Sequence, residues 1–429
     1  MQFAICRSGE DSRTSVADTL EQNGLNWLKF GDQYFCYAEE PAASIDWMRL
    51  KAAGAFLNRA TLGAGQPEKG SLYLVTQEGR LFQRAQPDVL VLFDRGRHLL
   101  VLLDERSVDK IVQHDARFSI RPVVRNEIIY ERLVRPEAPP RINRRTNEIV
   151  DAISQASFAA RLTELASHPT RHSLSSHFRE TANQARDQLS LMGYQVSLQP
   201  VSIPGGETLN VVADKRGLGS ERSVTLVSAH LDSVNHPADH TQPDDPTAPA
   251  PGADDNGSGS AGVIEIARVL KDQPIIQDLR LVLFGGEEQG LYGSKHYVNQ
   301  LSSADRQRIR SVVNMDMIGV DNTGRPGVLL EGRKPVSEPM IAGLSSMAHA
   351  YTRLTVDVSW NPWGSDHRPF IDANVPAVLT IEGHDDDNHN IHTANDTLNH
   401  INHDLALEIL RMNTAFIIDE IGLEGSATG

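Results

Sequence analysis

From about residue 150 onward the chain alternates short apolar runs with amphipathic stretches, and this alternation constrains the fold more than any other feature. Runs such as Val224–Ala229 and Leu279–Phe284 predict strands that are buried on both faces. Stretches such as Ser176–Met192, with apolar residues at three- and four-residue spacing, predict helices. The pattern predicts an α/β fold with a mostly parallel central sheet and helices on both faces. Further strands are predicted at Ser311–Asp316 and Ala377–Ile381, and further helices at Asp151–Ser167, Gly257–Leu270, Tyr292–Gln300 and Leu405–Ile421.

The N-terminal third has a different pattern. Short β-type runs at Ser71–Thr76, Val89–Phe93 and His98–Leu103 are separated by turn signals such as Glu78-Gly79. We therefore predict that residues 1–134 form a smaller, strand-rich accessory domain. Residues 135–145 (RPEAPPRINRR) contain three prolines among basic residues, which indicates a linker, and residues 146–429 then form the second domain.

The acidic charge is concentrated in the second part of the chain. The formal net charge is −15, of which residues 1–140 contribute −1 and residues 141–429 contribute −14. This balance disfavours nucleic acids and anionic membranes as partners, although acidity alone is usually a solubility device. It suits cationic ligands or metal ions.

The ends and the cysteines add little to this. No apolar run approaches the roughly 18 residues of a membrane span. The first 20 residues lack the apolar core of a secretory signal, which predicts a cytoplasmic location, or secretion if a signal has been removed. There is no CxxC motif, and whether Cys6 and Cys36 pair stays open.

Several catalytic motifs are absent, namely HExxH, GxSxG and GxxxxGK[ST]. A GxGxxG pattern does occur at Gly257–Gly262, where it could suggest a dinucleotide site. In such a site a strand leads directly into the glycines, but here the loop His236–Pro251 precedes them. Asp254 and Asp255 would also repel a pyrophosphate. We therefore reject this interpretation.

Acids and histidines recur at the ends of the predicted strands. Taken singly, each would most often be a helix cap or a structural residue. Because the carboxyl ends of parallel strands share one edge of a sheet, however, we expect these side chains to converge on one cleft. So many acids and imidazoles together need cations, and oxygen and nitrogen ligands suit Zn²⁺, with Mn²⁺ or Co²⁺ as substitutes. The candidates are His230, Asp232, Asp255, Glu287, Glu288, Asp316 and His392.

The sequence motifs around these residues resemble those of a known family. HLDSV, GADDNGSG, GGEEQGLYGS, NMDMIG, GSDHRPF and IHTANDT occur in this order. Residues 150–422 thereby resemble the co-catalytic di-zinc aminopeptidases, the family of the bacterial leucyl aminopeptidases. Glutamate carboxypeptidase, glutaminyl cyclase and the transferrin receptor are more distant relatives.

The resemblance implies a role for each candidate. His230 and Asp316 would bind one zinc ion and Glu288 and His392 a second, while Asp255 would bridge the two. Asp232 would orient the imidazole of His230, and Glu287 would be the general base.

The resemblance also implies an activity, the removal of N-terminal residues from peptides with a free N-terminus by a metal-bridging water that Glu287 activates. Alternatives are a carboxypeptidase, a glutaminyl cyclase or a receptor-like domain without catalysis. Many relatives have Tyr where this chain has Ile391, so the oxyanion donor stays open. We expect Asp366 and His367 to shape the cleft and His389 to be the main rival of His392.

Overall fold

The computed structural model describes residues 2–7, 16–38, 58–61, 70–77, 80–112, 118–136, 142–237 and 243–425. Within these ranges the chain forms two compact units. The first comprises Met1–Arg132 and Asp357–Gly364, and the second comprises Leu133–Val356 and Ser365–Gly429. Among the described helices, none combines the length and the apolar character needed to span a bilayer.

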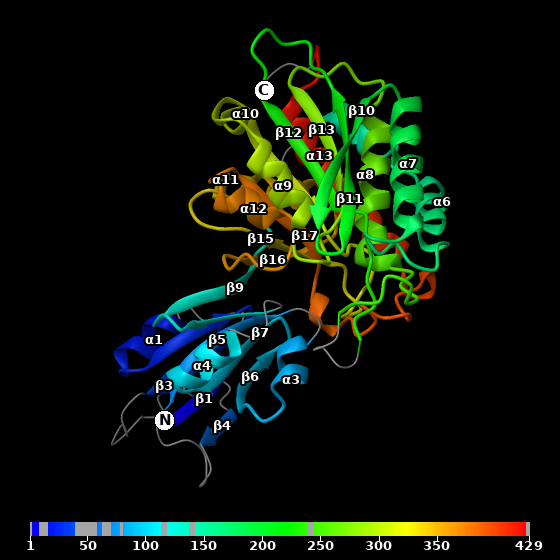
Figure 1. The fold of residues 1–429 in the computed structure, drawn as a ribbon. Helices are drawn as coiled ribbons and strands as arrows, with labels where there is room; N and C mark the ends of the chain where they lie inside the picture. Colours follow the sequence, from blue (N-terminus) through cyan, green and yellow to red (C-terminus); the bar gives the residue numbers. More distant parts are fainter. Residues whose placement is uncertain are drawn as a thin grey trace. The chain divides into compact units, whose positions relative to one another are not determined.

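The second unit is built on a central sheet with the strand order β10-β11-β13-β12-β14-β17-β15 (Figure 1). Its four middle strands, β13, β12, β14 and β17, run parallel, and antiparallel strands flank them on both sides. This confirms the predicted fold class. The bounds are β10 Gln195–Ile203, β11 Gly206–Lys215, β12 Val224–His230, β13 Asp278–Phe284, β14 Ile309–Met315, β15 Gly327–Glu331 and β17 Ala377–Glu382. A further strand, β16 Thr355–Ser359, begins in the second unit and ends in the first.

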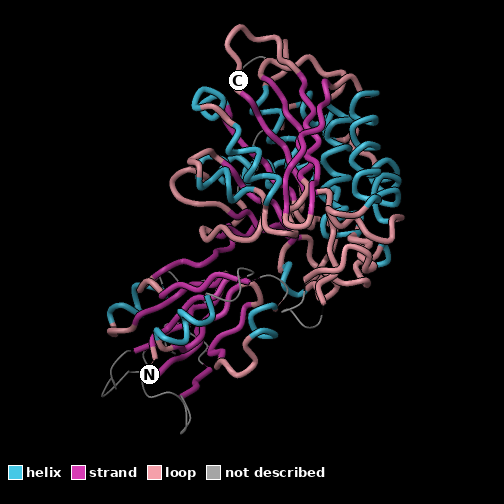
Figure 2. The backbone as a smooth tube through the Cα atoms, in the orientation of Figure 1, coloured by secondary structure: helices cyan, strands magenta, loops and turns pink. Residues whose placement is uncertain are grey.

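Helices cover both faces of this sheet (Figure 2). On one face α6, α7, α8 and α13 pack on the strands and on one another, and on the other face lie α9 and α12. There Phe284 and Val282 of β13 pack with Tyr297 and Phe370 in one buried apolar cluster. The helices are α5 Arg144–Val150, α6 Gln155–Ala166, α7 Ser176–Leu191, α8 Gly259–Leu270, α9 Tyr292–Gln300, α10 Ser303–Arg308, α11 Glu338–Tyr351, α12 His367–Asp372 and α13 His403–Ile421.

The start of α8 differs from the prediction. We expected a helix from Gly257 with Asp255 at its N-terminus, but the helix begins at Gly259 after an irregular turn, Ala253–Ser258. The side chain of Asn256 accepts the hydrogen bond from the backbone N–H of Gly259 at 2.9 Å. Asp255 is therefore not needed as a cap. The glycines of GxGxxG serve packing, since a Cβ on Gly259 would lie 2.8 Å from the carbonyl oxygen of Met315.

The first unit contains two sheets with the strand orders β9-β2-β3-β1-β4 and β6-β7-β5-β8. Aromatic and aliphatic side chains of both sheets, such as Phe30, Phe35, Leu74 and Leu100, form one buried cluster between them. Its elements are β1 Gln2–Arg7, α1 Val16–Gln22, β2 Asn26–Phe30, β3 Gln33–Ala38, β4 Asn58–Thr61, β5 Ser71–Gln77, α3 Leu81–Ala85, β6 Val91–Arg95, β7 His98–Leu103, α4 Glu105–Val112, β8 Phe118–Pro122 and β9 Glu127–Leu133.

The predicted strand-rich character of the N-terminal region is thus confirmed. The division into domains at 1–134, 135–145 and 146–429 stays a prediction, because a compact unit need not fold alone. Residues 137–141 of the predicted linker and the Glu78-Gly79 turn lie outside the described residues. Cys6 and Cys36 are buried free thiols with their sulfur atoms 3.1 Å apart.

Candidate metal centre

The candidate residues lie at the carboxyl ends of the parallel strands. His230 is the last residue of β12, Asp316 follows β14 directly, and Glu287 and Glu288 follow β13 across Gly285-Gly286. Gly286 adopts φ = +76°, a left-handed conformation that glycine tolerates without strain. The remaining three are Asp232, two residues after the end of β12, His392, in the loop after β17, and Asp255, in the turn before α8.

One carboxylate, Asp255, joins two groups of side chains. The Nε2 atom of His230 lies 3.2 Å from Oδ1 of Asp255 and 3.2 Å from Oδ1 of Asp316. The Nε2 atom of His392 lies 2.9 Å from the other oxygen of Asp255, Oδ2, and 3.2 Å from Oε2 of Glu288. We call these five residues, His230, Asp255, Glu288, Asp316 and His392, the strand-end cluster.

Burial and mutual charge shift the protonation of this cluster. Burial raises the pKa of Glu288 to about 8, and the neighbouring Asp255 carboxylate adds to the rise. Burial acts on Asp255 too, but the facing imidazoles of His392 and His230 outweigh it and hold the pKa of Asp255 well below its usual range. Burial opposes charge on His230 and His392, yet the surrounding carboxylates raise the pKa of both imidazoles well above the usual value.

This donor set fits divalent metal ions. Imidazole nitrogens and carboxylate oxygens without thiolates are ligands that Zn²⁺ accepts. The Oε1 atom of Glu288 is buried and has no hydrogen-bond partner among the described residues, which leaves a lone pair for a ligand. Three carboxylates this close to one another are costly to bury without positive charge between them. These observations fit the binding of divalent metal by the strand-end cluster.

Asp232 links both halves of the strand-end cluster. Its backbone carbonyl oxygen lies 3.1 Å from Nδ1 of His230, within hydrogen-bond distance, and one of its carboxylate oxygens lies 3.6 Å from the same nitrogen. The same carboxylate accepts long hydrogen bonds from the backbone N–H groups of Glu287, at 3.4 Å, and Glu288, at 3.3 Å. A hydroxyl from outside the cluster, that of Ser173, donates to Asp232 at 3.0 Å. Asp232 is fully buried. Its contacts support the imidazole of His230 and the backbone of Glu287 and Glu288.

Glu287 lies beside the strand-end cluster. Burial raises its pKa well above the usual range; the imidazole of His230 opposes this rise, and the carboxylates of Asp366, Glu288 and Asp316 add to it. A carboxyl group with a raised pKa next to a candidate metal site is suited to proton transfer near neutral pH.

The turn that carries Asp255 is held by residues that the sequence motifs had not singled out. The carboxylate of Asp396 accepts hydrogen bonds from the backbone N–H groups of Asp254 and Asp255, both at 2.9 Å. Asp396 belongs to the same IHTANDT motif as His392, and that shared motif could have indicated its role. The guanidinium of Arg171, also fully buried, donates to the carbonyl oxygens of Leu231 at 2.9 Å and Gly252 at 2.8 Å.

The GSDHRPF motif supports Asp316. The hydroxyl of Ser365 donates to Oδ2 of Asp316 at 2.6 Å and accepts from the side chain of Asn314 at 2.9 Å. Burial raises the pKa of Asp366 to about 7, and its charge is felt by Glu287. His367 is turned to a different partner, with its Nε2 3.4 Å from Oε1 of buried Glu331.

Near His392 the neighbour is a different histidine from the expected rival. His236, Glu288 and His392 form a group with ligand atoms within 4.8 Å of one another, and the rings of His236 and His392 are 4.6 Å apart. His236 also lies 2.8 Å from Asp244. His389, the expected rival, is exposed. Ile391, at the position where many relatives have Tyr, is buried in an apolar cluster with Met317.

Comparisons with known proteins find similar peptidases. Residues 210–417 match the family model described as Peptidase family M28. Leupeptin-inactivating enzyme 1 of Streptomyces exfoliatus is 33% identical over 214 residues, which are 48% of this chain and 43% of that protein. Aminopeptidase YwaD of Bacillus subtilis is 31% identical over 216 residues, 47% of this chain and 42% of that protein. The chain thus spans less than half the length of either curated relative.

A solved structure extends the comparison to the fold. The LapA aminopeptidase of Legionella pneumophila is similar to 83% of this chain over its full length, with a TM-score of 0.57 and 19% identity. At this level of identity the similarity shows the fold alone.

Proposed function

We propose that the chain belongs to peptidase family M28, whose family model matches residues 210–417, and that it is a zinc-dependent aminopeptidase that hydrolyses the N-terminal bond of peptides. One observation supports this above the others. The two oxygens of Asp255 face two separate imidazoles, each with a further carboxylate beside it. This arrangement supports the proposal of two metal ions that would share Asp255 as a ligand.

In this proposal two zinc ions are held by the strand-end cluster. His230 and Asp316 would hold one ion, Glu288 and His392 the other, and Asp255 both. Bound zinc supplies Lewis acidity that polarises a scissile carbonyl and lowers the pKa of water toward neutrality. His236 is the candidate for an additional metal ligand beside His392.

The remaining work falls to Glu287 and Asp232. Glu287 takes the proton of the attacking water and returns it to the leaving amine. Asp232 keeps the imidazole of His230 and the backbone of both glutamates in place. The net charge of −14 over residues 141–429 favours a substrate with a cationic free α-amine. A cytoplasmic location and a role of residues 1–134 in limiting access to short peptides are part of the same proposal.

A single peptide can test the activity. We propose to incubate the zinc-loaded protein with a peptide that begins with glutamine, and with the same peptide N-acetylated. We expect stepwise loss of N-terminal residues from the free peptide only. Loss of C-terminal residues would indicate a carboxypeptidase, and loss of ammonia without chain shortening a glutaminyl cyclase. A protein that binds zinc and leaves all peptides intact would be a receptor-like domain.

A further inference from the structure

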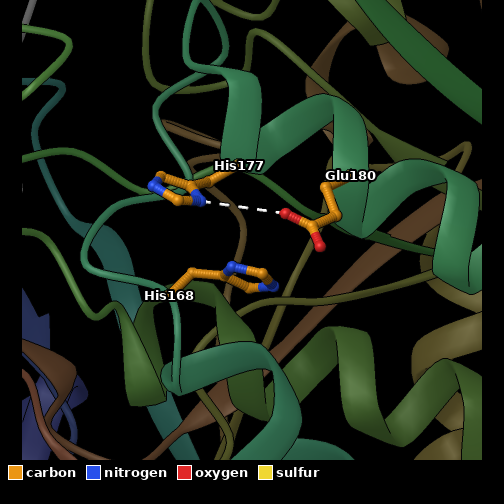
Figure 3. A group of neighbouring side chains, drawn as sticks. All are labelled: His168, His177 and Glu180. Carbon is orange, nitrogen blue, oxygen red and sulfur yellow. Dashed lines mark ion pairs between the residues drawn. The ribbon is translucent and has the colours of Figure 1, made fainter.

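A second cluster of metal-binding side chains lies outside the strand-end cluster. His168 lies in the loop after α6, and His177 and Glu180 lie at the start of α7. One ligand atom from each of the three residues falls within 4.8 Å of the other two. Figure 3 shows the imidazole rings of His168 and His177 next to each other, with the carboxylate of Glu180 directed toward the ring of His177.

Part of this cluster could be an ordinary surface ion pair. His177 and Glu180 are three residues apart on a helix, and Nδ1 of His177 lies 3.9 Å from Oε2 of Glu180. Such an exposed pair contributes little to stability. It does not account for His168, which comes from another segment and places its ring 5.4 Å from that of His177, at 42°. Two imidazoles gain nothing from this approach if both are charged, but they can share a cation as neutral ligands.

We propose that His168, His177 and Glu180 form an additional metal site for a divalent transition-metal ion such as Zn²⁺. Two imidazole nitrogens and one carboxylate oxygen suit Zn²⁺ and its neighbours rather than Ca²⁺ or Mg²⁺, which prefer oxygen ligands alone. The side chains of His177 and Glu180 are 40% and 58% exposed, so water can complete the coordination. The site shares no residue with the strand-end cluster.

The loop between His168 and His177 carries residues that support the strand-end cluster, so an ion bound at its ends would stabilise that loop. The segment from His168 to His177 contains Arg171 and Ser173. Arg171 holds the backbone at Leu231 and Gly252, and Ser173 donates to Asp232 and accepts from the backbone N–H of Gly286 at 2.7 Å. An ion held by His168 and His177 would close the two ends of this supporting loop. Cross-linking a short loop lowers the entropy of its open forms, as a disulfide does.

The first test counts bound zinc. Metal-free full-length protein is titrated with Zn²⁺, and bound zinc per chain is measured at each free concentration. We expect His168→Ala and Glu180→Gln to lose one zinc-binding step that the unchanged protein has. Glu180→Gln keeps the size of an exposed side chain, so it serves as the variant least prone to misfolding. We expect its affinity for that step to fall more than the roughly 10–100-fold that removing an outer-shell partner costs.

The matched control is His349→Ala. His349 is a half-buried histidine on α11 that belongs to none of the three groups of candidate ligands in the described residues. We expect this variant to bind as much zinc as the unchanged protein. Equal zinc binding in all four proteins would overturn the proposal. Because the comparison is a difference between variants, it holds whatever number of ions the strand-end cluster binds.

The second test addresses the loop. Backbone amide exchange of residues 170–175 is measured with and without saturating Zn²⁺. We expect zinc to slow exchange several-fold in the unchanged protein and in His349→Ala, and to have a smaller effect in His168→Ala. If zinc slows these amides equally in His168→Ala, the protection comes from the strand-end cluster and the loop-closing role is wrong.

Discussion

The two compact units bury different chemistry, although both are built around sheets. Between the two sheets of the first unit the buried cluster is apolar, with side chains such as Phe30, Phe35 and Leu100. At the strand ends of the second unit the buried side chains are acids and imidazoles that contact one another within 3.2 Å. Apolar burial is independent of pH and metal, whereas a buried charge depends on its partners. Stability and function should therefore respond to different changes in the two regions.

The largest expected effect separates two adjacent residues of the strand-end region. Glu287→Gln removes the proton acceptor and keeps the side-chain size, so kcat should fall by about 10²–10⁴-fold, or roughly 3–5 kcal/mol, with KM little changed. Both zinc ions should stay bound. Glu288→Gln removes a ligand charge, so it should lose one zinc ion and regain activity in excess zinc.

Zinc content and activity of both variants decide between these roles. A Glu287→Gln protein that loses one ion and recovers with added zinc would mean that the roles are exchanged.

A pair of substitutions, one in each unit, tests the comparison directly. Leu100→Ala opens a cavity in the fully buried core of the first unit and should cost about 2–5 kcal/mol, with zinc content unchanged. Asp396→Asn turns an amide NH₂ toward one of the backbone N–H groups of Asp254 and Asp255. It should weaken zinc binding by roughly 10–100-fold.

The readouts are denaturant unfolding and zinc titration of both proteins. If Leu100→Ala lowers zinc affinity as much as Asp396→Asn does, the two regions are not independent.

The next prediction concerns pH in protein stripped of metal. The pKa values of Glu288 and Asp366 are raised to about 8 and about 7, and those of His230 and His392 are raised as well. Folded chains then bind more protons than unfolded chains, so stability falls as pH rises from about 5.5 to 8.5. Asp255, with a lowered pKa, keeps its contribution throughout this range.

We expect the Tm of the metal-free protein to drop by a few degrees over this range, because one pKa unit corresponds to about 1.4 kcal/mol. Zinc replaces the protons, so the zinc-loaded protein should show a smaller drop. Equal slopes with and without zinc would argue against metal binding by the strand-end cluster.

The smallest expected effect is on substrate length. If residues 1–134 restrict access, a chain starting at Arg141 should cleave long peptides relatively better than the full chain does, by a few-fold. The alternative, that these residues only aid folding or assembly, predicts an unchanged ratio of long to short substrates. Zinc content of the shortened chain is the necessary control, since Asp357–Gly364 belongs to the first unit and directly precedes Ser365.

Much of the second unit could be predicted from periodicity. Continuous apolar runs such as Val224–Ala229 are strands because both of their faces are buried, and β12 is found at Val224–His230. The edge strand β10 was not predicted, because most of its residues are exposed or half-buried and its apolar signal is weak. The neighbouring strand β11 was not predicted either, because the polar residues Thr208 and Asn210 interrupt its buried apolar run. The start of α8 was placed two residues early because the turn around Asp255 follows no periodicity.

The sequence by itself determined which residues could meet. Acids and imidazoles that follow parallel strands share one edge of the sheet. The proximity of His230, Asp316 and Glu288 could therefore be predicted. The six motifs from HLDSV to IHTANDT carry the family resemblance in their wording and order, and neither depends on how the chain packs.

Only the tertiary structure decided which atoms face each other. It turned one oxygen of Asp255 to His230 and the other to His392, and it placed His236 rather than His389 beside His392. It also placed the ring of His168 next to that of His177, at the two ends of a loop in which Arg171 donates a hydrogen bond to the backbone of Leu231. Loops have no repeating pattern that a sequence could display, and their conformation follows from long-range contacts that form only when the whole chain has packed.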